Sequence, residues 1–150
     1  MTSALQPYRG SYLMPPFDRA TVVDVMRPGV MSCAPDAPLG AVAETMATHR
    51  VHCVVVGGMT RDDAGGEHLV WGLVSDLDIV RAARSGIEGH TAADAARTEI
   101  VTVDPSTSLS EAARLMDEHA TAHLVVVSGG HPTGVVSSLD IAAALAWGRS

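Results

Sequence analysis

Apolar residues recur every three or four positions in two separate parts of the chain. The first part has Leu39, Val42, Ala43 and Met46 at the i, i+3, i+4, i+7 spacing of a helix with one buried face. The same spacing returns 70 residues later (39 to 109) in Leu109, Ala112, Ala113 and Met116. We therefore predict two equivalent amphipathic helices. The same offset aligns Arg27 with Arg97.

Short apolar runs surround each predicted helix and favour β-strands. An extended piece precedes each helix and is halted by proline, at 30–34 and at 100–104. Two further strands and a closing helix follow, at 54–56, 69–74 and 79–83 in the first half and at 124–127, 133–136 and 141–147 in the second. Each half is thus predicted to fold as β-α-β-β-α.

Valine on both faces of these strands indicates sheets that are covered on both sides. We predict an α/β (α+β) fold in which the two β-α-β-β-α repeats pack pseudo-symmetrically through their sheets, neither half being stable alone. The polar, glycine-rich segments "GGMTRDDAGGEH" (57–68) and "SGGHPT" (128–133) are predicted to be hairpin loops. Ser108 and Glu111 favour a capping box, and Pro38 suits the first turn of the other helix.

One phrase occurs twice, at the end of each repeat. Residues 72–82 read "GLVSDLDIVRA" and residues 134–144 read "GVVSSLDIAAA". The repeats predict a first unit over residues 21–88 and a second over residues 89–150. Residues 1–20 contain prolines and a glycine without periodicity, and we expect them to form a flexible N-terminal arm.

Composition narrows the possible partners. A net charge of −7, with ten arginines and no lysine, argues against a protein that binds a nucleic-acid backbone. Two cysteines, Cys33 and Cys53, lack a disulfide-framework spacing and suit a reducing cytosol. The sequence has neither an apolar run long enough to span a membrane nor a hydrophobic signal core. We expect a cytoplasmic protein that binds neither nucleic acid nor membranes.

The repeats, their "GLVSDLDI" and "GVVSSLDI" endings and the strands "VVVG" and "VVVS" resemble tandem CBS domains, also called a Bateman module, over residues 21–147. The resemblance implies a stand-alone regulatory sensor and no enzyme. It implies an adenosine-containing ligand (AMP, ATP, S-adenosylmethionine or similar) in the cleft between repeats, and no covalent cofactor. It also implies a homodimer formed through the alanine-rich closing helices, with a regulated protein that the sequence does not identify.

The resemblance places two half-sites at the repeated phrase. A serine that ends a strand before a helix start offers a hydroxyl and N–H groups to a phosphate, and the aspartate can accept from ribose hydroxyls. These pairs are Ser75 with Asp78 and Ser137 with Asp140. By position, further ligand contacts are His52, Arg50 and Arg81 in the first repeat, His123 in the second, and Ser32 and Thr102 in the short first strands. The extra cations predict tighter polyphosphate binding at the first half-site.

Other interpretations fit the same residues. Asp78 and Asp140 suit plain helix caps, and Arg81 suits a solvated helix face. The alternative to a ligand sensor is a ligand-free dimerisation or protein-interaction module with degraded sites, and the arginines near the first half-site favour the sensor. The histidines and cysteines match no standard zinc spacing, so no metal site is predicted. No Gly-x-Ser-x-Gly elbow supports a hydrolase.

Overall fold

The computed structural model describes residues 15–61 and 67–148, which form two compact units. One unit is continuous in sequence and runs from Val30 to Ile100. The other joins the segment that ends at Gly29 to the segment that starts at Val101. The two units are named below the central unit and the terminal unit.

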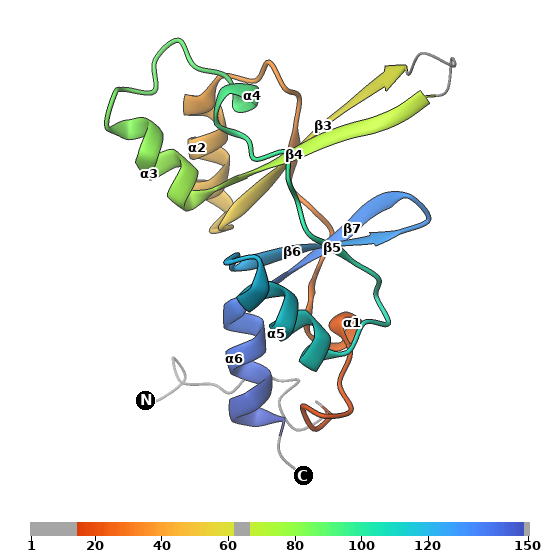
Figure 1. The fold of residues 1–150 in the computed structure, drawn as a ribbon. Helices are drawn as coiled ribbons and strands as arrows, with labels where there is room; N and C mark the ends of the chain where they lie inside the picture. Colours follow the sequence, from red (N-terminus) through yellow and green to blue (C-terminus); the bar gives the residue numbers. More distant parts are fainter. Residues whose placement is uncertain (1–14, 62–66, 149–150) are drawn as a thin grey trace. The chain divides into compact units, whose positions relative to one another are not determined.

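The central unit contains a three-stranded sheet with helices α2, α3 and α4 (Figure 1). The sheet has the order β2-β3-β4, in which β2 is parallel to β3 and β4 is antiparallel to it. Leu39, Val42 and Met46 of α2 pack with Val54, Val56 and Val74 of the sheet. The elements are β2 (Ser32–Cys33), α2 (Leu39–His49), β3 (Cys53–Arg61), β4 (Glu67–Ser75), α3 (Asp76–Ala83) and α4 (Ala92–Ala95).

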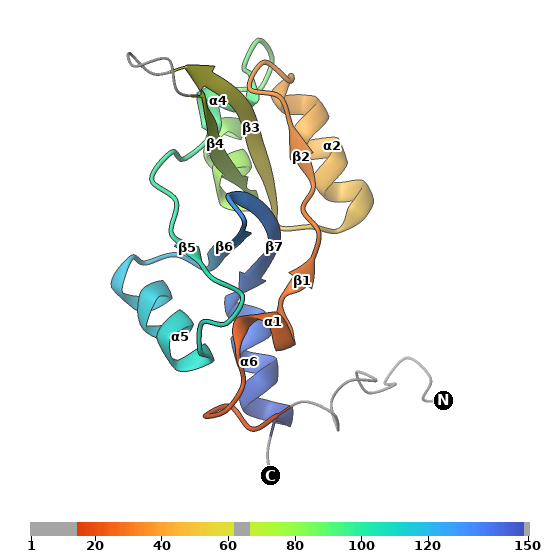
Figure 2. The same ribbon diagram turned by 90° about the vertical axis from the view of Figure 1, so that its right-hand side faces the viewer.

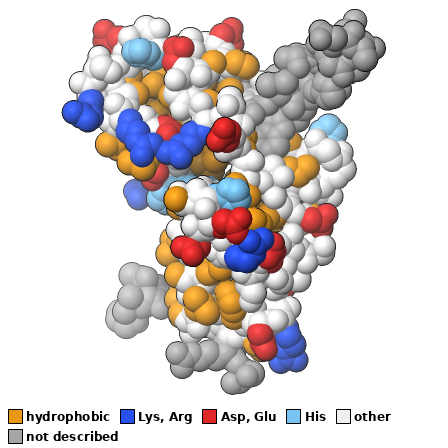
Figure 3. Space-filling view, in the orientation of Figure 1, with side chains coloured by type: hydrophobic (Ala, Val, Ile, Leu, Met, Phe, Trp, Pro, Cys, Tyr) orange, Lys and Arg blue, Asp and Glu red, His pale blue; other side chains and the backbone are white. Residues whose placement is uncertain are grey.

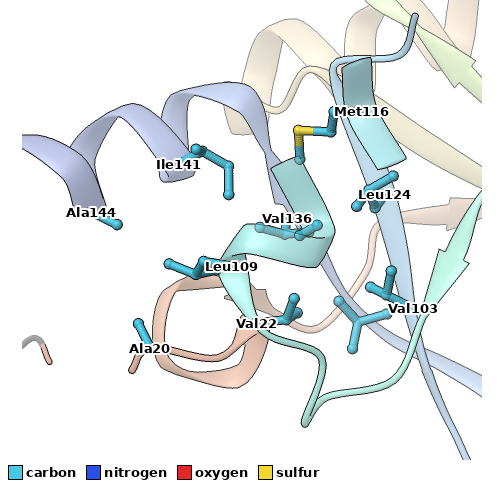
Figure 4. Close-up of a cluster of buried hydrophobic side chains, with 11 residues drawn as sticks. Ala20, Val22, Val103, Leu109, Met116, Leu124, Val136, Ile141 and Ala144 are labelled. Carbon is cyan, nitrogen blue, oxygen red and sulfur yellow. The ribbon is translucent and has the colours of Figure 1, made fainter. Parts of the chain in front are cut away.

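The terminal unit contains a four-stranded sheet in the order β1-β7-β6-β5. Leu109 of α5 and Leu124 and Val136 of the sheet are fully buried in its core, together with Val22 of α1 (Figure 4). The elements are α1 (Val22–Val25), β1 (Arg27–Pro28), β5 (Thr102–Val103), α5 (Leu109–Glu118), β6 (His123–Ser128), β7 (His131–Ser137) and α6 (Ser138–Trp147).

Each unit is completed by the segment that precedes the other repeat in the sequence. Helix α1 and strand β1 come before the first repeat, yet β1 pairs antiparallel with β7 of the second (Figure 2). In the same way, α4 comes before the second repeat but packs in the central unit. Just after α4, Arg97 forms an isolated antiparallel β-bridge with Leu73 of β4. Ala20 is 1% exposed and belongs to the core of the terminal unit. The predicted arm before residue 15 lies outside the described residues.

The structure confirms the two β-α-β-β-α repeats and the α+β fold class, and it adds α1 and α4, which the periodicity did not predict. The first hairpin loop was predicted too long, because β3 continues to Arg61 and β4 starts at Glu67. At α5, Ser108 caps the helix by accepting from the Glu111 N–H at 3.1 Å. The Glu111 carboxylate instead accepts from Nε of Arg114 at 2.9 Å, so the predicted box is only half formed.

Candidate functional site

Ser75 and Asp78 lie where β4 ends and α3 begins, and together they form a capping box. The backbone N–H and the hydroxyl of Ser75 donate to Oδ2 of Asp78 at 2.8 and 2.9 Å. In return, Oγ of Ser75 accepts from the Asp78 N–H at 3.3 Å. The local backbone therefore holds the pair, and Asp78 is only 7% exposed.

Ser137 and Asp140 form the same box between β7 and α6. Oδ2 of Asp140 accepts from the Ser137 N–H at 2.8 Å and from its hydroxyl at 3.0 Å. Asp140 is half-buried. Its second oxygen, Oδ1, has no hydrogen-bond or ion-pair partner among residues 15–61 and 67–148. As far as the described residues go, the carboxylate of Asp140 thus keeps one oxygen available.

The capping box is not confined to the repeated phrase. Thr21 with Asp24 caps α1, and Thr91 with Asp94 caps α4, each through a 2.8 Å bond from the threonine N–H to the aspartate Oδ2. Hydrogen bonds from Thr91 lower the pKa of Asp94 below its ordinary value. Helix capping therefore accounts for the Ser-x-x-Asp spacing without a ligand. The ligand role of the Ser–Asp pairs stays a prediction.

The glycine that opens each phrase has its own structural reason. A Cβ on Gly134 would lie 2.7 Å from the carbonyl oxygen of Arg27 and 2.8 Å from Sδ of Met26. A Cβ on Gly72 would lie 2.9 Å from the carbonyl oxygen of Arg97. Arg27 and Arg97 belong to the segments that complete the two units. Each glycine therefore leaves room for the backbone of that segment to pass close to the strand.

Two arginines flank the Asp78 carboxylate in the central unit. Nε of Arg97 donates to Oδ1 of Asp78 at 3.2 Å, and Nη1 of Arg81 lies 3.7 Å from the same oxygen. Figure 3 shows the cationic side chains gathered over α3. Sequence reasoning proposed Arg81 and missed Arg97. The offset that aligns Arg97 with Arg27 was the available signal, but it does not reveal that Arg97 reaches Asp78.

The other predicted contacts lie near the strand ends. His52 directly precedes β3, and its Nδ1 lies 2.9 Å from Oδ2 of Asp76, the first residue of α3. His123 starts β6 and is opposite Ser137 in the register. Ser32 and Thr102 start β2 and β5 and are exposed, and Arg50 ends α2 in the left-handed region. Their roles as ligand contacts stay predictions.

A pocket of about 320 Å³ lies beside Asp78 in the central unit. It combines apolar walls with the opposite charges of Asp78 and Arg81, and Asp94 adds a second carboxylate. Its lining residues are Leu39, Asp78, Arg81, Ala82, Ser85, His90, Asp94 and Ala95. Among the residues predicted from the sequence, Asp78 and Arg81 are the two that reach this pocket.

Two further features are absent from residues 15–61 and 67–148. No three His, Cys, Asp or Glu side chains there come together in a way that could hold a metal ion. No helix in this part of the chain has both the length and the apolar character needed to cross a membrane.

Comparison with known proteins gives one consistent result. The family model described as "CBS domain" matches residues 22–85 and 92–146. The CBS domain-containing protein YhcV of Bacillus subtilis (strain 168) is 27% identical over 125 residues, which span 82% of this chain and 84% of that protein.

Solved structures share the fold. The CBS domain pair of protein MJ0100, in complex with 5′-methylthioadenosine and S-adenosyl-L-methionine, superposes with a TM-score of 0.68 at 18% identity, over 82% of this chain and 97% of that one. A hexameric CBS-CP12 protein from bloom-forming cyanobacteria gives a TM-score of 0.71 at 18% identity, over 81% of this chain and 69% of that one.

Proposed function

The chain belongs to the CBS domain family, with one domain matched in each repeat, and we propose that it is a regulatory module that senses an adenosine-containing ligand. We propose AMP, ATP, S-adenosylmethionine or a close relative as the ligand, held at the repeated Ser-x-x-Asp phrase. The module would signal to a regulated protein by a change in its own conformation or stability. We assign it no catalytic role.

The observation that carries this proposal is the Ser137–Asp140 pair, at the position where the family resemblance places a ribose contact. The capping box uses Oδ2 of Asp140 and leaves Oδ1 without a partner in the described part of the chain. An ionised carboxylate has about four lone-pair sites, so capping and ribose binding are compatible on one side chain. The adenosine ligands of the MJ0100 domain pair support the choice of ligand class.

The test is calorimetric titration of AMP, ATP and S-adenosylmethionine into the wild type and Asp140→Asn. The amide oxygen of asparagine still accepts from the Ser137 N–H, so the cap survives. We expect an unchanged melting temperature without ligand and an affinity at least about ten-fold lower, equivalent to about 1.4 kcal/mol. The amide causes the loss because it replaces one acceptor oxygen with a donor.

Asp24→Asn is the matched control, because Asp24 forms the same capping box in the same unit. It should bind the three ligands as the wild type does. Wild-type protein that gives no heat with any of the three ligands would refute the adenosine assignment. Asp140→Asn that binds like the wild type would show that the aspartate is a cap only.

A second candidate, a protein-interaction module, is favoured by the closing helices. Leu77 and Val80 of α3 and Leu139 and Leu145 of α6 are exposed, and Leu139 is 69% exposed. Figure 3 shows hydrophobic side chains gathered over α6. Exposed apolar side chains on neighbouring helical turns suit helix packing against a second copy. We propose a homodimer formed through these helices, which is compatible with ligand sensing.

A further inference from the structure

The two Ser–Asp pairs share a capping geometry but differ at the second carboxylate oxygen. In the central unit, Oδ1 of Asp78 accepts from Nε of Arg97 at 3.2 Å, and Arg81 lies 3.7 Å away. In the terminal unit, Oδ1 of Asp140 has no such partner among residues 15–61 and 67–148. Arg27 is the repeat equivalent of Arg97, and it makes no ion pair with Asp140.

We infer that Arg97 is an internal competitor for the Asp78 carboxylate, so that the chain has one open half-site, at Asp140, and one that is closed. This inference rests on the proposed function, because it concerns which half-site accepts the adenosine ligand. The inference predicts tighter ligand binding at the Asp140 half-site, whereas the number of nearby arginines favours tighter binding at the Asp78 half-site.

The count of acceptor sites supports the inference. Ser75 donates twice to Oδ2 of Asp78, and Arg97 donates once to Oδ1. About one of the four lone-pair sites of the carboxylate is left, whereas a ribose diol needs two. Asp78 is also 7% exposed, so little of the carboxylate is accessible to a ligand. A ribose at this half-site must therefore displace the guanidinium.

The backbone of Arg97 holds its side chain beside Asp78. Its backbone is fixed against β4, because the Arg97 N–H donates to the Leu73 carbonyl and the Leu73 N–H donates to the Arg97 carbonyl, both at 2.9 Å. The side chain itself is about half exposed at 49%. A substitution of the side chain therefore removes the competitor while the backbone pairing remains.

The experiment uses a variant in which only the Asp78 half-site can bind. Asp140→Asn removes the open half-site, and AMP, ATP and S-adenosylmethionine are titrated by calorimetry into this variant with and without Arg97→Ala. We expect Arg97→Ala to restore binding, with a gain of about ten-fold or more in affinity. Adding Asp78→Asn to the double variant should abolish the restored binding. Arg97→Met, which keeps the aliphatic stem, should behave like Arg97→Ala.

Arg27→Ala in the Asp140→Asn background is the matched control, and it should restore nothing. In the wild-type background, Arg97→Ala should raise the stoichiometry from one ligand per chain to two. If the wild type already binds two ligands per chain, or if Arg97→Ala weakens binding because Arg97 contacts a phosphate, the competitor role is overturned while adenosine binding stands. If no variant, the wild type included, binds any of the three ligands, the proposed function itself fails.

Discussion

Substituting Gly134 by alanine tests the structural reason for the glycine in the repeated phrase. The added Cβ would meet the Arg27 carbonyl oxygen at 2.7 Å and Sδ of Met26 at 2.8 Å. Comfortable contacts for a Cβ start near 3.4 Å. The Met26 side chain can turn aside, but the Arg27 carbonyl belongs to a strand whose register opposite β7 is set. We therefore expect β1 to be pushed away from β7.

The expected loss of stability follows from two contributions. Overpacking at a site that cannot relax costs about 1–3 kcal/mol. Displacing β1 also weakens the hydrogen bond from the Gly29 N–H to the Thr133 carbonyl, which is 2.8 Å long, and a bond of this kind contributes about 1 kcal/mol. We expect Gly134→Ala to lower the free energy of unfolding by about 2–4 kcal/mol, a large part of the stability of a small domain.

The assay is urea unfolding followed by circular dichroism, with hydrogen exchange at the Gly29 amide as the local readout. Gly57→Ala is the matched control, because Gly57 is also a strand glycine and a Cβ there would meet nothing within 4 Å. Gly72→Ala should resemble Gly134→Ala, since its Cβ would lie 2.9 Å from the Arg97 carbonyl oxygen. If Gly134→Ala unfolds at the same urea concentration as Gly57→Ala, the close-approach argument is wrong.

Three further predictions concern other parts of the chain. Ala120 has a φ of 50°, which lies in the left-handed region. Ala120→Gly should therefore raise the free energy of unfolding by about 0.5–1 kcal/mol. A free energy of unfolding below that of the wild type, measured by urea denaturation, would contradict this. Leu139→Glu should convert the proposed homodimer to monomers in sedimentation equilibrium while circular dichroism shows a folded chain, because Leu139 is 69% exposed. A dimer that persists would place the interface elsewhere. Burial raises the pKa of the Cys33 thiol, so less thiolate is present at a given pH. When Cys33 is alkylated by iodoacetamide in the Cys53→Ser variant, the pH midpoint of the reaction should lie above that of free cysteine.

The elements themselves were predictable, because their signals are local. The spacing of Leu39, Val42 and Met46 identified α2, and these three residues are the ones it buries. The valine runs identified β3 and β6, although the polar sequence at 57–61 hid the continuation of β3 to Arg61. Helices α1 and α4 were missed because four residues are too few to show a helical period.

The candidate site was predictable only in part. The repeated phrase located Ser75, Asp78, Ser137 and Asp140, and the structure shows what the phrase does locally, which is to cap two helices. Two neighbours were not predicted: Asp76, which lies beside His52, and Arg97, which binds Asp78 from 19 residues away along the chain. Neither contact follows a helical or strand period, so no pattern in the sequence marks it.

The two repeats and the helices and strands of their β-α-β-β-α pattern follow from the sequence alone, because each depends on residues within a few positions of one another. The tertiary structure alone shows that β1 joins the second repeat and that Arg97 returns to the first. It also shows why Gly72 and Gly134 are glycines, because the atoms that exclude a side chain there belong to distant segments. Such contacts depend on the path of the whole chain. That path gives the carboxylate of Asp78 an arginine partner that the otherwise equivalent carboxylate of Asp140 lacks among the described residues.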